Sequence, residues 1–114
     1  MIKRGDIYWV TPTEANGITS STMHPYVVIA VNITDKNDTA SVCALTTNMN
    51  KVSIAGNVLL ELGEANLPKQ SIVEVSKRFT LQTTELGEYI GTLSQERLEQ
   101  ILAGIQFVEC SFLK

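Results

Sequence analysis

The segment from Met23 to Asn48 constrains the fold more than any other part of the chain. Its sequence, MHPYVVIAVNITDKNDTASVCALTTN, has an unbroken apolar run at Tyr26 to Val31 and a second strand-like run at Ala40 to Thr46, with residues rich in Asn and Asp between them. An apolar run of this length between turn residues is typical of a strand that is buried on both faces. Asn and Asp adopt turn conformations readily. We therefore expect two antiparallel strands joined by a turn.

This strand pair places a histidine near two threonines. Pro25 lacks an amide hydrogen and restricts the residue before it, so His24 is expected to be extended at the first step of its strand. An antiparallel pair puts the start of one strand beside the end of the other, which brings Thr46 and Thr47 close to His24. A side chain that titrates near neutral pH beside hydroxyl donors is where we expect chemistry. The alternative is a strand-end histidine bonded to backbone, with threonines that only favour β structure.

Further short strands are expected on both sides of this pair. We place them at residues 6–10, 57–61, 71–76, 78–82 and 88–93. Short strands at this spacing, with turns between them, favour a small and strongly curved sheet or a partly closed barrel. The polar residues 11–22 form a long loop that ends next to His24, so they either cover the proposed site or make a plain surface connection.

One helix is expected at the end of the chain. Ser94 is a good N-cap, and Glu96 suits the positive end of the helix dipole. Five apolar residues then fall on one face at helical spacing: Leu98, Ile101, Leu102, Ile105 and Val108. Gly104 lowers helix propensity and so predicts close packing at that point. Phe107 and Phe112 lie off this face, and we expect them to complete the core rather than face a partner.

Composition limits the location and the partners. The 114 residues, 44% of them hydrophobic, suit one globular domain spanning residues 1–114. The net charge of −3 argues against a general grip on nucleic-acid phosphates but leaves room for a small basic patch. No apolar segment is long enough to cross a membrane, and the N-terminus lacks a signal peptide's features, so a cytoplasmic protein is expected. Cys43 and Cys110, with a single histidine, are too few for a structural zinc site and are expected to be reduced and packed.

Five motifs occur in a characteristic order along the chain: KRGDIYWV, HPYVVIAVN, CALTTN, LPKQSIVEV and IGTLSQERLEQI. In these motifs the chain resembles the MazF/PemK family of toxin endoribonucleases over nearly its whole length. The resemblance implies a mainly β, α+β fold, a small SH3-like β barrel of the MazF/PemK/CcdB type with a C-terminal helix, assembled as a homodimer. It also implies cleavage of single-stranded mRNA at short sequences without a metal or other cofactor, leaving a cyclic phosphate and a free 5′ hydroxyl. A cognate antitoxin would hold the enzyme inactive by laying an extended tail over the RNA groove.

The family's catalytic pair is an arginine directly before the proline and a threonine that ends the neighbouring strand. The threonine corresponds to Thr46, whereas His24 occupies the arginine position. Histidine suits the proton transfers of RNA cleavage but lacks arginine's permanent charge and two-pronged grip on phosphate. The candidates to contact RNA and supply that charge are Thr47, Lys51, Lys77 and Arg78, while Phe79 stands where the family often has an arginine.

The sequence leaves three functions open. The first is a metal-independent, sequence-specific endoribonuclease in which His24 moves protons and Thr46 donates a hydrogen bond to phosphate. The second is a non-catalytic dimeric module of the same fold that binds antitoxin, RNA or another protein. The third is a gyrase poison of related fold, which is weaker because the C-terminus does not resemble the target-binding end of those toxins. The aromatic residues Trp9, Tyr26 and Phe79 could stack on bases, but we expect all three in the core.

Overall fold

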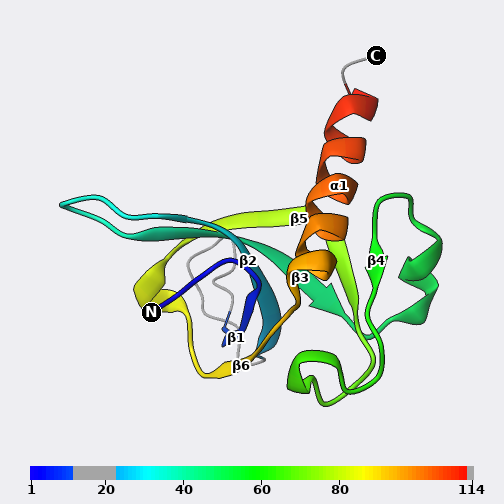
Figure 1. Cartoon of the computed structure of the whole chain (residues 1–114), viewed down its shortest axis with the longest axis horizontal. Coiled ribbons are helices and arrows are strands. Elements are labelled where there is room, and N and C mark those ends of the chain that lie inside the picture. Colours follow the sequence, from blue (N-terminus) through cyan, green and yellow to red (C-terminus); the bar gives the residue numbers. More distant parts are fainter. Residues whose placement is uncertain (12–22, 113–114) are drawn as a thin grey trace.

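The computed structural model describes residues 1–11 and 23–112, which form a curled antiparallel sheet and a C-terminal helix (Figure 1). The strands are β1 Asp6–Val10, β2 His24–Asn32, β3 Thr39–Thr46, β4 Val58–Leu59, β5 Ile72–Gln82 and β6 Tyr89–Thr92, and the helix is α1 Gln95–Phe112. Short 3-10 helices follow three of the strands: η1 Met49–Ser53, η2 Glu64–Asn66 and η3 Thr83–Glu85. This arrangement confirms the predicted small, curved β structure with one terminal helix.

The sheet has the strand order β4-β5-β3-β2-β1-β6, and each described pair is antiparallel. Its two ends approach each other through η2. The side-chain amide of Asn66 donates to the carbonyl oxygen of Ile90 in β6 at 3.3 Å. A Cβ added to Gly91 would lie only 2.1 Å from the carbonyl oxygen of Ala65, so a glycine is required where η2 crosses β6. The sheet is therefore a half-barrel.

Residues 71–76 and 78–82, predicted as two strands, form the single strand β5. The pairing with β3 jumps between them, because Cys43 pairs with Arg78 whereas Ala44 pairs with Glu74. Two consecutive residues of β3 thus pair with residues of β5 that are four positions apart. The three unpaired residues between them, 75–77, form a bulge. Bulges bend a strand and re-aim its side chains, and this one lies beside the site described below.

The strand β2 supplies apolar side chains to both faces of the sheet, as predicted. Val27 and Ile29 belong to a cluster with the buried helix residues Ile101 and Ile105. Tyr26 and Val28 belong to a second cluster with Val10, Ala40, Val42 and Ala44. Because successive strand residues point to opposite faces, the first cluster lies on the helix side of the sheet and the second on the other side.

The helix docks through its predicted apolar face. Its N-terminus is capped by Ser94, whose Oγ accepts a hydrogen bond from the amide of Arg97 at 3.1 Å. Leu98, Ile101 and Ile105 are buried, and Leu102 and Val108 pack against them. A Cβ on Gly104 would lie 2.2 Å from the carbonyl oxygen of Gly56, which confirms the close packing predicted there.

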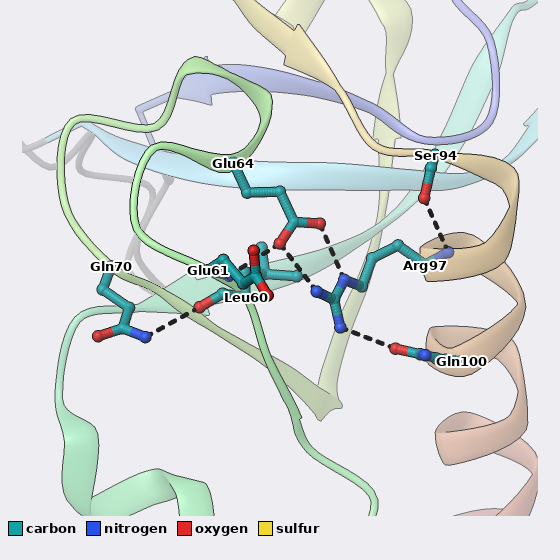
Figure 2. A network of polar contacts seen from close by, with 7 residues as sticks. All are labelled: Leu60, Glu61, Glu64, Gln70, Ser94, Arg97 and Gln100. Atoms are coloured by element: carbon teal, nitrogen blue, oxygen red, sulfur yellow. Dashed lines mark hydrogen bonds and ion pairs between the residues drawn. The ribbon is translucent and has the colours of Figure 1, made fainter.

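A polar network ties the helix to the loop after β4 (Figure 2). Arg97 in α1 donates through Nε and Nη2 to the two carboxylate oxygens of Glu64, at 2.8 and 3.0 Å, and through Nη1 to Gln100 at 2.8 Å. Bidentate arginine–carboxylate pairs are among the stronger and more directional polar contacts. The pair therefore fixes η2, the segment that joins the two ends of the half-barrel, against the first turn of α1.

Three expectations about the core were wrong. Phe107 is 55% exposed and Phe79 is 47% exposed, although both were expected in the core. Phe107 lies off the apolar face of α1 that Leu98, Ile101 and Ile105 bury against the sheet, so the core does not bury it. The last turns of α1 extend past the sheet (Figure 1). Cys110 is exposed on the same helix, while Cys43 is buried. Burial raises the pKa of the Cys43 thiol to about 12, against the opposing effect of the positive charge of Arg78.

Some predictions fall on parts of the chain that the structure does not describe or describes differently. The side chain of Phe112 and residues 12–22 of the proposed covering loop lie outside the described residues. The strand expected at 57–61 contains two paired residues, and the one expected at 88–93 contains four. Among the described residues, no helix is both long and apolar enough to span a membrane.

Candidate functional site

A pocket of about 350 Å³ opens where β2, β3 and β5 lie side by side, on the face opposite to the helix. The strands line it with His24, Tyr26, Ala44, Thr46, Glu74 and Phe79. Lys51 reaches it from η1, and Lys77 from the bulge in β5. The pocket thus gathers residues from β2, from β3 with the adjoining η1, and from β5, which are separated in the sequence.

Strand register explains why these side chains meet. Tyr26 pairs with Ala44, and Ala44 pairs with Glu74, so these three residues form one row across three strands. Residues directly opposite one another share a face of the sheet, as do residues two apart on one strand. Two steps from this row, at the start of β2 and the end of β3, lie His24 and Thr46. The structure therefore brings His24 and Thr46 to one pocket, as the hairpin topology predicts.

His24 and Thr46 both remain accessible to a ligand. The His24 side chain is exposed, and Thr46 is half-buried. The Oγ1 of Thr46 accepts a hydrogen bond from the amide of Asn48 at 3.1 Å, which orients the hydroxyl and leaves its own hydrogen free to donate. Asn48 also caps η1 by accepting from the amide of Asn50 at 3.1 Å. Asn48 therefore orients the Thr46 hydroxyl through its amide and caps the short helix that carries Lys51 through its side chain.

The charged residues give the pocket a local positive surplus in a chain whose net charge is −3. Two lysines, Lys51 and Lys77, face one carboxylate, Glu74. Glu74 is only 5% exposed, and its Oε2 lies 3.4 Å from the Nζ of Lys77, whose side chain is 57% exposed. A buried carboxylate is costly without a partner, and the Lys77 ammonium supplies that partner at the pocket. The small basic patch that the sequence left room for is present.

Two aromatic side chains form one wall. Tyr26 and Phe79 meet edge to face, with ring centroids 6.0 Å apart and an interplanar angle of 71°. Burial, and then the negative charge of Glu74, raise the pKa of Tyr26, so its phenol stays protonated and can donate a hydrogen bond. Tyr26 is buried as expected, whereas the half-exposed Phe79 offers a free ring surface at the pocket.

Two of the predicted contact residues lie elsewhere. Thr47 is exposed and is not among the residues that line the pocket. Arg78 faces the helix side of the sheet, where it lines a separate groove with Leu102 and Ile105 and pairs with Glu109 at 3.4 Å. The structure therefore brings together His24, Thr46, Lys51 and Lys77 but not Thr47 or Arg78.

Glu74 was absent from the sequence-derived site. The signal that could have found it is a single carboxylate inside the apolar run SIVEV. A charged residue flanked by buried valines, Val73 and Val75, either breaks the strand or faces a polar pocket. In this fold Glu74 stays within β5 and faces the pocket.

The fold is a half-barrel with a terminal helix, and its pocket over β2, β3 and β5 is lined by charged and aromatic residues. These features define a class of small single-sheet proteins. The family model described as "PemK-like, MazF-like toxin of type II toxin-antitoxin system" matches residues 3–108. Since this match covers nearly the whole chain, the chain belongs to that family.

Individual relatives agree with this assignment. The chain is 27% identical over 110 residues to endoribonuclease MazF6 of Mycobacterium tuberculosis and to endoribonuclease MazF2 of Mycobacterium bovis, covering 95% of this chain and 96% of each relative. A mycobacterial endoribonuclease solved in complex with its cognate antitoxin has a similar fold, with a TM-score of 0.65, 18% identity, and coverage of 93% of this chain and 90% of that one. A second mycobacterial endoribonuclease gives a TM-score of 0.66 at 17% identity, with coverage of 93% and 88%.

Proposed function

We propose that this protein is the endoribonuclease toxin of a type II toxin–antitoxin pair. The observation that carries the proposal is the convergence of His24, Thr46, Lys51 and Lys77 on one accessible pocket in a chain of this family. The substrate is single-stranded RNA, chiefly mRNA, cut at a short preferred sequence. The named activity of the mycobacterial relatives supports the same reaction.

The pocket contains groups suited to cleavage by the RNA's own 2′ hydroxyl. His24 takes the proton from that hydroxyl as its oxygen bonds to phosphorus. The bond from phosphorus to the 5′ oxygen then breaks, and His24 returns a proton to the leaving oxygen. The products are a 2′,3′-cyclic phosphate and a free 5′ hydroxyl. Proton transfer by a positioned side chain contributes typically about 10²- to 10⁴-fold in rate.

Charge that develops on the phosphate needs stabilisation during this reaction. The Thr46 hydroxyl donates to a non-bridging phosphate oxygen, because its oxygen is already occupied by the Asn48 amide and its hydrogen is free. Lys51 and Lys77 supply the positive charge that the family's arginine would otherwise provide. All of these roles use protein groups alone, so the proposed reaction needs no metal and no cofactor.

The proposed partners follow from the same family. A cognate antitoxin is proposed to inhibit the enzyme by covering the pocket. The complex of a structural relative with its cognate antitoxin supports an antitoxin as partner. The active form is proposed to be a homodimer in the cytoplasm, where mRNA is available.

The decisive experiment is incubation of the purified protein with a defined long RNA in the presence of EDTA. We expect new ends at a few sites, carrying cyclic phosphates and 5′ hydroxyls, and no cleavage where a 2′-deoxy sugar replaces the attacking ribose. Cleavage that requires an added metal, or ends with 5′ phosphates, would contradict the mechanism.

A second candidate function is a binding module that does not cut. The feature that favours it is His24 itself, which replaces an arginine that grips phosphate with two hydrogen bonds. Such a module would bind antitoxin or RNA with measurable affinity and produce no new RNA ends under the conditions above.

A further inference from the structure

The residues that line the pocket differ in how far they are buried. His24 is exposed and Thr46 half-buried, whereas Glu74 and Tyr26 are buried and Phe79 beside them is half-exposed. Ala44, between Tyr26 and Glu74 in the same row of the sheet, has too small a side chain to fill the space between them. Two residues along a strand cover about 7 Å and the step to the next strand about 5 Å. Glu74 is therefore about 9 Å from Thr46 and, one strand farther, about 12 Å from His24, so a base attached to a ribose between those two groups can extend to it.

Glu74 has unused capacity to accept hydrogen bonds. An ionised carboxylate accepts through two oxygens with about four lone-pair sites. Among the described residues its one partner is the Lys77 ammonium at 3.4 Å, which is longer than a good charged hydrogen bond. Beside it, the half-exposed ring of Phe79 is held in place by its contact with Tyr26. A buried double acceptor next to a fixed aromatic face suits a nucleobase that is read on its edge and stacked on its plane.

We propose that Glu74 and Phe79 select guanine in the nucleotide that lies at the cleavage site. Of the four RNA bases, only guanine presents two adjacent donors, N1–H and the N2 amine, on its Watson–Crick edge, and these match the two carboxylate oxygens of Glu74. Adenine and cytosine present one donor beside an acceptor, and uracil one donor between two acceptors, so each sets an acceptor against the carboxylate. The inference rests on RNA being the ligand, as proposed above, and adds the base and the residue that reads it.

Binding of uncleavable RNA tests this selectivity apart from catalysis. The probes are fluorescent hexauridylates with 2′-fluoro sugars, which lack the attacking hydroxyl, and with guanosine, inosine, adenosine or cytidine at one central position. Fluorescence anisotropy should show guanosine binding about 5- to 150-fold more tightly than adenosine or cytidine, the range for one bidentate base contact. Inosine, which keeps N1–H but lacks the amine, should fall between them.

Glu74→Gln should remove the preference for guanosine and move it toward adenosine and cytidine, because the amide offers one acceptor and one donor. Glu88→Gln, the same change at an exposed carboxylate outside the pocket, is the matched control and should bind as the wild type does. Phe79→Ala should weaken all four probes by about 5- to 150-fold, from loss of stacking, without changing their order. If Glu74→Gln does not fold, the inosine series on the wild type and Phe79→Ala still test the pocket.

Equal affinity for the four probes, or a guanosine preference that survives Glu74→Gln, overturns the inference. Selective binding by a protein that never cuts natural RNA supports the base pocket and counts against the proposed nuclease function. Cleavage of RNA without any base preference supports the nuclease function and counts against the base pocket. The two proposals therefore fail on different observations.

Discussion

Arg97 in α1 grips both carboxylate oxygens of Glu64 in η2, through Nε at 2.8 Å and Nη2 at 3.0 Å. Burial alone would raise the pKa of Glu64. The hydrogen bonds from Arg97 and from the Glu61 amide, together with the arginine charge, outweigh that effect and lower the pKa below its ordinary value. The pair joins the helix to the segment that closes the half-barrel, so its loss should be seen in the stability of the whole fold.

Glu64 should make the protein less stable in acid. A carboxyl whose pKa is lowered by folding contributes stability that is fully present above its unfolded pKa, about 4.3, and is lost as the pH falls through the folded pKa. Thermal unfolding followed by circular dichroism should therefore show the melting temperature of the wild type falling between neutral pH and pH 3. Glu64→Gln should melt lower at pH 7 and fall less steeply in acid. Parallel pH curves for the two proteins would show that the pair adds nothing to stability.

His24→Ala should lower the cleavage rate by about 10²- to 10⁴-fold, the usual contribution of a positioned proton-transfer group. The exposed side chain should leave folding unchanged, which circular dichroism checks. His24→Arg restores the family's residue and should cut with a rate that varies little between pH 5 and 8, the range in which a histidine ordinarily changes charge. Equal rates for wild type and His24→Ala would remove histidine from the mechanism.

Thr46→Val keeps the shape of the side chain and removes its hydroxyl. Loss of a donor to a developing anion costs about 10²- to 10³-fold in rate, and we expect that loss in single-turnover cleavage assays. Thr46→Ser keeps the hydroxyl and should retain most of the activity. The valine variant also loses the acceptor for the Asn48 amide, worth about 1 kcal/mol of stability, so unfolding is measured alongside. A valine variant as active as the serine variant would argue against the role of the hydroxyl.

Gly104→Ala tests the contact between the helix and Gly56. In an open helix this change would stabilise the protein by about 1 kcal/mol. Here the added Cβ would lie 2.2 Å from the Gly56 carbonyl oxygen, and we expect destabilisation of about 1 to 3 kcal/mol, as for other overpacked sites. Chemical denaturation measures the sign directly. Ala103→Gly, at the exposed neighbouring position, is the control and should cost about 1 kcal/mol from helix propensity alone.

Local patterns in the sequence were enough to predict the main elements. The apolar stripe from Leu98 to Val108 predicted the docked face of α1, and Ser94 predicted its start, because helix period and capping are local properties. The apolar run at Tyr26 to Val31 predicted a strand with both faces covered, and the structure buries Tyr26–Ile29 on alternate sides. The closeness of His24 and Thr46 also followed from the sequence, because any antiparallel hairpin joins those two ends.

Only the tertiary structure decided which side chains of β5 point to the pocket and which point to the helix. Continued from the pair of Ala44 with Glu74, a regular register would place Arg78 opposite Ala40, on the pocket side of the sheet. The bulge adds three residues, and an odd number reverses which face each later side chain takes. Arg78 is thereby turned to the helix, and Phe79 is turned to the pocket. No periodic signal marks such a bulge, because it depends on how two distant strands pair. For the same reason, the burial of Glu74 and the exposure of Phe79 could be learned only from the folded chain.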